Sequence, residues 1–181
     1  MGMVDKDKLR EKLLQWEDLF QDYSLPTWND FPALPLYMDQ VIILLNRYLA
    51  LLPEQAEQKQ ITPAMVNNYV KLKIIPPPLK KRYNRVHLAY LMIVCVCKQT
   101  LNTNDIKKLM PLSLSDDEVR CVYEDFASAF GSIQVYFRAE VRKAVAPVLS
   151  DENVPVTHLL FRTAAAANLT KQLTEEILRL A

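Results

Sequence analysis

The chain has 181 residues with a net charge of +1, and 50% of the residues are hydrophobic. A chain of this length folds as one domain or two small ones, and its composition excludes an intrinsically disordered protein. With only two glycines, it has little material for tight β-hairpins or glycine-rich phosphate loops. No apolar run reaches the roughly 18 residues of a membrane span, and the charged N-terminus does not resemble a signal peptide. We therefore expect a mainly α-helical, cytoplasmic protein without membrane contacts.

Apolar periodicity and proline positions predict the elements in chain order. A first helix covers 5–22, and the proline-rich residues 24–35 form an extended segment laid across a surface. Further helices are predicted over 36–52, 63–73, 85–99, 101–110, a long stretch from Ser115 that Gly131 bends or splits, and 156–181. The predicted domains are an N-terminal segment 1–35, a module 36–112 and a C-terminal helical region 113–181.

Positive charge is concentrated in one part of the chain. From Gln58 to Asn104 there are eight Lys or Arg and no Asp or Glu, whereas the remainder carries 14 basic and 21 acidic residues. A local excess of this kind indicates an anionic partner, of which a nucleic-acid backbone is the commonest.

The short helix predicted over 63–73 has two different faces. Thr62 and Pro63 are a helix-start signal, and the far side of the helix carries Asn67, Asn68 and Lys71. Asn can pair with adenine and Lys with guanine, so these three residues are predicted to contact bases. The residues predicted to contact phosphate are Lys73, Lys80, Lys81, Arg82, Tyr83 and Arg85. A plainer interpretation is a solvated polar face followed by a basic surface loop.

The order of elements from 36 to 112 resembles the MerR-type winged-helix regulators. The resemblance is carried by Tyr69 in the helix, by "IIP" after it and by "KRY" in the basic segment. More closely, "LPLYMDQVI", "TPAMVNNYVK" and "KKRY" are similar to the bacterial family of unknown function numbered 1836, over residues 28–112. The resemblance implies a winged helix-turn-helix with a small β wing, which binds double-stranded DNA as a homodimeric transcription regulator.

The C-terminal region is helical and rich in aromatic residues. It is predicted to contain a dimerisation helix and an effector pocket for an unknown small molecule, lined by Tyr123, Phe126, Phe130, Tyr136 and Phe137. A plainer interpretation is that these aromatics belong to the core.

Cysteines and histidines offer no catalytic or metal-binding pattern. Cys95 and Cys97 lie about 200° apart in the most apolar helix, so we expect buried structural thiols rather than a sensor. An odd number of cysteines in apolar surroundings fits a reducing compartment. Without a nucleotide loop or nucleophile motif, we expect neither an enzyme nor a cofactor. The alternatives to DNA binding are a helical module that docks an acidic protein through the basic patch, and a small-ligand-binding protein with a degenerate winged helix.

Overall fold

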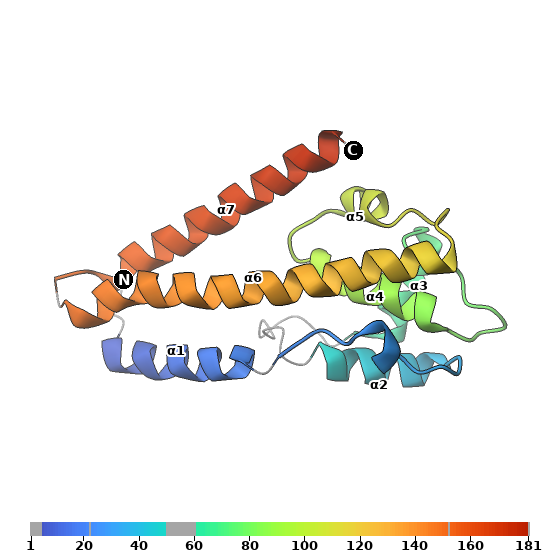
Figure 1. The fold of residues 1–181 in the computed structure, drawn as a ribbon, viewed down its shortest axis with the longest axis horizontal. Helices are drawn as coiled ribbons and strands as arrows, with labels where there is room; N and C mark the ends of the chain where they lie inside the picture. The colour runs from blue at the N-terminus through green and yellow to red at the C-terminus, as the bar shows by residue number, and fades with distance from the viewer. Residues whose placement is uncertain (1–4, 22, 50–60, 152, 181) are drawn as a thin grey trace.

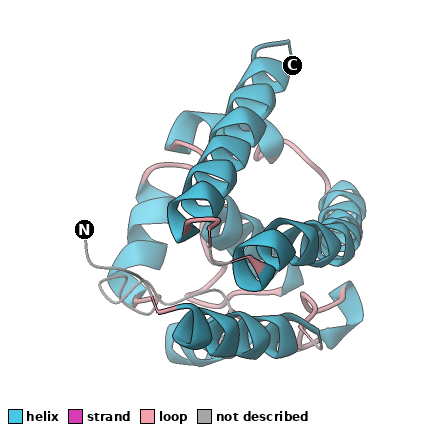
Figure 2. Cartoon of the chain, turned by 90° about the vertical axis from the view of Figure 1, so that its left-hand side faces the viewer, coloured by secondary structure: helices cyan, strands magenta, loops and turns pink. Residues whose placement is uncertain are grey.

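The computed structural model describes residues 5–21, 23–49, 61–151 and 153–180, and these form seven α-helices and one 3-10 helix. In chain order they are α1 (Lys6–Gln21), η1 (Trp28–Asp30), α2 (Met38–Tyr48), α3 (Pro63–Lys71), α4 (Arg85–Cys97), α5 (Thr103–Leu109), α6 (Asp116–Ser150) and α7 (Val156–Leu180). The predicted helices are all present within these ranges, although residue 22, residues 50–52 and residue 181 of the predictions lie outside the described part. Over the same ranges there is no β-strand, only two isolated bridges (Figure 2).

The longest element is α6, a helix of 35 residues along which the other helices are arranged (Figure 1). It starts with a capping box, in which the Glu118 carboxylate accepts the Ser115 N–H at 2.7 Å. The first-turn acids Asp116 and Asp117 are favourable at the positive end of the helix dipole. The helix passes through Gly131 without the predicted break, because the same apolar face continues on both sides of this glycine and is anchored at both ends of the helix.

The main core surrounds α4, in which every residue from His87 to Cys95 is buried. The proline-rich segment crosses this core as predicted. The Phe31 and Tyr123 ring centroids are 4.9 Å apart, and the Tyr123 hydroxyl donates to the Pro26 carbonyl at 2.7 Å. Because Phe31, α4 and Tyr123 share one core, the predicted boundaries at 35 and 112 do not separate independent cores.

A second, smaller cluster lies at the far end of α6. There Val145 and Val148 pack with Leu159 of α7, and Leu13 of α1 covers the same cluster. From this cluster α7 runs back in the direction of α5, rising away from α6 at an angle (Figure 1), and near its end Leu178 joins the main core. Between these two anchored ends, residues 160–173 of α7 are exposed.

Candidate nucleic-acid interface

The first component of the candidate interface is the exposed face of α3. The Thr62 hydroxyl caps the helix by accepting the Met65 N–H at 3.3 Å, and Val66 is fully buried on the inner face. On the outer face, four exposed residues follow the i, i+3, i+4, i+7 spacing of one helix side: Ala64, Asn67, Asn68 and Lys71. Within the described part of the chain, the side chains of the three predicted base-contacting residues make no hydrogen bond or ion pair, so their polar groups are available to a ligand.

The end of α3 is made by a lysine in the left-handed conformation. Lys73 has a φ of 54°, the Ile74 N–H donates to the Tyr69 carbonyl at 2.9 Å, and the Lys73 N–H donates to the Val70 carbonyl at 3.0 Å. These two bonds form a Schellman motif, whose left-handed position is usually glycine. The helix therefore ends at Lys71, two residues before the predicted end at Lys73.

The second component is a two-residue turn, which we call the lysine hairpin (residues 79–82). Leu79 and Arg82 exchange two backbone hydrogen bonds of 3.1 and 2.9 Å. Lys80 and Lys81 between them have φ values of 49° and 63°. Positive φ at both central residues is the mark of a type I′ hairpin turn, for which Asn-Gly is the usual sequence. The chain thus builds the tight hairpin for which its composition seemed unsuited, and does so with lysines.

The base of this loop is held at two points. Tyr83 pairs with Leu36 through two backbone hydrogen bonds of 2.8 Å, which tie the loop to the start of α2. The buried His87 ring lies with Nε2 3.1 Å from the Pro77 carbonyl and with Nδ1 3.2 Å from the backbone nitrogen of Asn84. Nδ1 also lies 2.5 Å from Asn84 Oδ1. Burial lowers the pKa of His87, and the ring links α4 to the proline segment.

Two of the residues predicted to contact phosphate have packing or hydrogen-bonding roles within the fold. Tyr83 is only 2% exposed and belongs to the main core, because successive side chains of an extended segment point to opposite sides and Arg82 takes the outer one. Burial also raises the pKa of Tyr83. The half-buried Arg85 donates from Nε to the Phe31 carbonyl at 2.9 Å, so it anchors the proline-rich segment. The Tyr83 side chain is therefore not presented to a phosphate in this conformation, and the Nε of Arg85 is occupied by the Phe31 carbonyl.

Arg82 has a partner that the sequence did not indicate. Its Nη2 donates to the Tyr37 hydroxyl at 2.8 Å, and its guanidinium carbon lies 4.6 Å from the Tyr37 ring centroid. Both side chains are exposed, so this cation–π pair orients the guanidinium at the surface. No local sequence signal joins these two residues, because only the Leu36–Tyr83 bridge brings them together.

Comparison with known protein families places this interface within a recognised sequence unit. Residues 26–126 match the family described as domain of unknown function (DUF1836). The chain belongs to the DUF1836 family. No curated protein matches the sequence, and no solved structure does so either. The DUF1836 match contains α2 to α5, the lysine hairpin and the beginning of α6, and therefore the whole of the interface described above.

The aromatic residues of the predicted effector pocket lie partly inside and partly beyond the DUF1836 match. Tyr123 is fully buried, and Phe126 and Phe130 pack against the main core. Tyr136 and Phe137 are 61% and 49% exposed farther along α6. Since 14 residues of helix extend over roughly 21 Å, these five side chains are too dispersed to line one small pocket. The core interpretation therefore describes the first three of them.

The cysteines of the DUF1836 region are positioned as packing residues. Burial raises the pKa of Cys95 to about 12 and that of Cys97 to about 11, so both thiols are protonated at neutral pH. Cys121 is exposed on α6. Across the described ranges no three His, Cys, Asp or Glu side chains gather as a metal site, and no helix is long and apolar enough to cross a membrane.

Proposed function

We propose that this DUF1836 protein is a DNA-binding transcription regulator with a MerR-like winged-helix arrangement. In this proposal α3 enters the major groove and the lysine hairpin contacts the neighbouring phosphates. The observation that carries the proposal is the conformation of three lysines. Among the described non-glycine residues, positive φ occurs at Lys73, Lys80 and Lys81. All three are exposed, and none has an ion pair in the described structure.

The left-handed conformation costs an L-residue about 1–2 kcal/mol, and glycine or asparagine would avoid most of this cost. Backbone conformation alone therefore disfavours lysine at all three positions. Strained residues concentrate at functional sites, where another requirement outweighs the strain. A requirement for positive charge at these turns accounts for all three lysines together.

The chemistry of α3 suits a helix that reads bases. Ala64 is a small residue in the first turn of the exposed face and permits close approach of the backbone to a groove. Asn67 and Asn68 beside it carry amides that can pair with adenine, and Lys71 can donate to guanine. The absence of acidic residues from Gln58 to Asn104 removes any repulsion from this part of the chain.

The relative placement of the two components also fits a duplex. In Figure 1 the green loop after α3 projects from the same end of the molecule as α3 and the start of α4. A recognition helix and a neighbouring basic loop can then contact the groove and its flanking backbone together.

The proposal includes a homodimer formed through α7. Six residues of α7 are spaced alternately by four and three positions, as in a coiled-coil seam: Arg162, Ala166, Leu169, Leu173, Glu176 and Leu180. Leu169 and Leu173 are 65% and 62% exposed, so a single copy leaves this seam uncovered. An antiparallel pairing brings Arg162 of each copy toward Glu176 of its partner, whereas a parallel pairing brings like charges together. A second copy in antiparallel orientation is thus the occupant that the charges favour.

The decisive experiment measures binding of the protein to labelled DNA from upstream of its own gene by fluorescence anisotropy at several salt concentrations. Three free lysines per copy neutralise about six phosphates per dimer, so log K should fall against log[salt] with a slope of roughly −5. Unrelated DNA should bind more weakly by about a thousandfold. A response independent of salt would contradict the proposal.

The purified protein also distinguishes the two alternative functions, which are docking of an acidic protein and binding of a small ligand. An acidic protein partner would co-purify with the wild type and be lost when Lys80 and Lys81 are changed to Glu, without any DNA binding. A small ligand carried through purification, again without DNA affinity, would favour a ligand-binding helical protein.

A further inference from the structure

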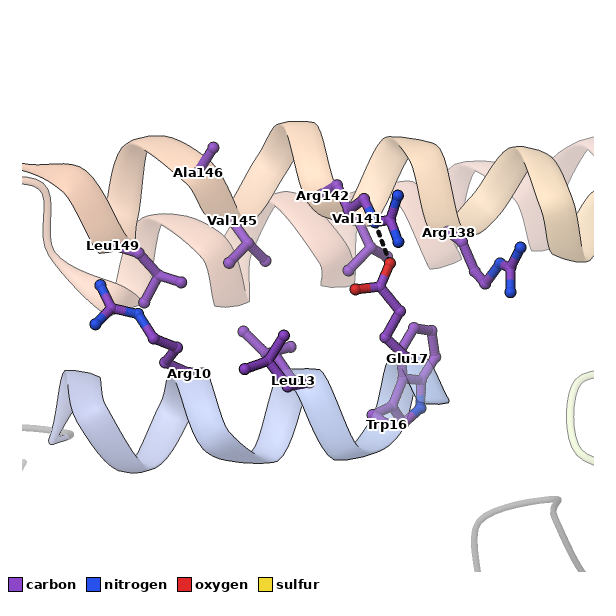
Figure 3. A pocket seen from close by; sticks show the side chains of 11 residues that line it. Arg10, Leu13, Trp16, Glu17, Arg138, Val141, Arg142, Val145, Ala146 and Leu149 are labelled. Carbon is purple, nitrogen blue, oxygen red and sulfur yellow. Dashed lines mark hydrogen bonds and ion pairs between the residues drawn. The ribbon is translucent and has the colours of Figure 1, made fainter. Parts of the chain in front are cut away.

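A groove separates α1 from the C-terminal half of α6, with a volume of about 240 Å³. Its floor is apolar and is formed by Leu13 and Trp16 of α1 together with Val141, Val145 and Leu149 of α6. Figure 3 shows Leu13 pointing from α1 toward Val145 and Leu149. The groove lies at the opposite end of α6 from the lysine hairpin, so it is independent of the proposed DNA interface.

The rim of this groove is positively charged. Arg10, Arg138 and Arg142 line it together with a single carboxylate, that of Glu17. Glu17 is ion-paired with Arg142, as the dashed line in Figure 3 marks. Arg10 pairs with the exposed Asp7 at 3.7 Å. Arg138 has no ion pair with any described residue, although it is half-buried at the Trp16 end of the groove. Three cations and one anion leave the groove with an excess of positive charge.

An apolar floor with a guanidinium at one end that has no ion pair among the described residues is complementary to an amphipathic anion. Arg binds a carboxylate through two parallel N–H donors, and the hydrocarbon part of such a ligand would cover Val141, Trp16 and Leu13. A cavity of this size holds about eight groups of the size of a water molecule or a methylene. We propose that the groove binds an aliphatic carboxylate of about eight to ten carbons, with its carboxylate on Arg138.

Such a ligand would contact both α1 and α6. Besides the groove, α1 is held by Lys6, whose Nζ donates to the Asp151 and Val154 carbonyls at 2.8 and 3.1 Å. Covering the apolar floor from both helices would stabilise the position of α1 along α6. The site also differs from the one predicted from the α6 aromatics, since none of those five residues lines it.

Trp16 provides a direct measurement, because it lines the groove, whereas the other tryptophan, Trp28, is buried in the main core. Decanoate, decanol and decyltrimethylammonium are titrated separately into the full chain below their micelle concentrations, while tryptophan emission is recorded. We expect a saturable change with decanoate and affinities at least about tenfold weaker for the two other probes. Trp16→Phe should abolish the change.

The matched pair of variants is Arg138→Gln and Arg120→Gln. Both residues lie on α6, but Arg120 pairs with Glu124 outside the groove. Arg138→Gln should weaken decanoate binding about tenfold, Arg138→Lys should restore part of it, and Arg120→Gln should leave it unchanged. Circular dichroism of each variant verifies the fold. Equal responses to decanoate and decyltrimethylammonium, or an Arg138→Gln variant that binds decanoate as tightly as the wild type, would overturn the assignment.

Discussion

The imidazole of His87 lies with Nε2 3.1 Å from the carbonyl oxygen of Pro77, and this contact joins α4 to the loop that carries the lysine hairpin. His87 and Tyr83 also pack edge to face, with ring centroids 5.4 Å apart. Nδ1 lies 3.2 Å from the backbone nitrogen of Asn84 and 2.5 Å from its Oδ1, so the ring is held on both sides.

This arrangement predicts a loss of stability in mild acid. Burial lowers the folded-state pKa of His87 below its ordinary value of 6.5, so the unfolded chain binds the proton more readily. The contribution of neutral His87 to the free energy of unfolding is fully present above pH 6.5. It is lost as the pH falls from 6.5 through the lower folded-state pKa. Thermal unfolding followed from about pH 8 to about pH 5 should show a falling Tm. His87→Gln should flatten this dependence.

Replacing the two central lysines of the lysine hairpin should raise the stability of the fold and lower its affinity for DNA. Changing Lys80 to Asn and Lys81 to Gly supplies the preferred type I′ sequence, so we expect a gain of about 1–2 kcal/mol in the free energy of unfolding. The same change removes about four phosphate contacts per dimer, and the slope of log K against log[salt] should shrink by roughly 4. Denaturant titration and anisotropy measure the two effects separately.

A charge-matched control for this variant is the pair Lys8→Asn and Lys12→Asn on α1, which alters the net charge equally but away from the interface. The control should keep the wild-type DNA affinity. If the hairpin variant also keeps it, the strained lysines do not serve DNA binding.

Tyr83 and Arg85 should affect folding rather than DNA contacts. Tyr83→Phe keeps the buried ring, so DNA affinity should stay within about twofold of wild type, whereas Tyr83→Ala should destabilise the fold by about 3–5 kcal/mol. Arg85→Ala removes the donor to the Phe31 carbonyl and should cost about 1–3 kcal/mol. DNA affinities of the variants, corrected for the fraction of each that is folded, separate an effect on folding from an effect on DNA binding. A large drop in corrected affinity for Tyr83→Phe would restore the original prediction of a phosphate contact.

The α7 seam predicts the oligomeric state. Replacing Leu169 and Leu173 with Glu should convert the proposed dimer to a monomer, because buried like charges would oppose each other across the seam. Sedimentation equilibrium measures the mass directly. Leu34→Glu, at a residue that is 79% exposed away from α7, is the control and should remain dimeric. A wild-type chain that sediments as a monomer at high concentration would exclude dimerisation through the α7 seam.

Most of the secondary structure could be predicted from local sequence. The Thr62–Pro63 start of α3 and the Ser115 capping box are local signals, and the structure contains both. The polar face of α3 was equally predictable, because helical periodicity places Asn67, Asn68 and Lys71 on one side whatever the rest of the chain does.

The direction and availability of the basic side chains were decided only by the tertiary structure. The letters "KKRY" give no reason for Tyr83 to be buried, and the bridge between Leu36 and Tyr83 settles it by joining segments 47 residues apart. The same bridge places Arg82 on Tyr37, and the crossing of the proline-rich segment places the Phe31 carbonyl where Arg85 reaches it. Sequence by itself determined the helices and the concentration of charge, since both depend on neighbouring residues. Long-range packing decided which cations remain free. Some side chains are buried or hydrogen-bonded to backbone atoms far away in the sequence, and others stay exposed.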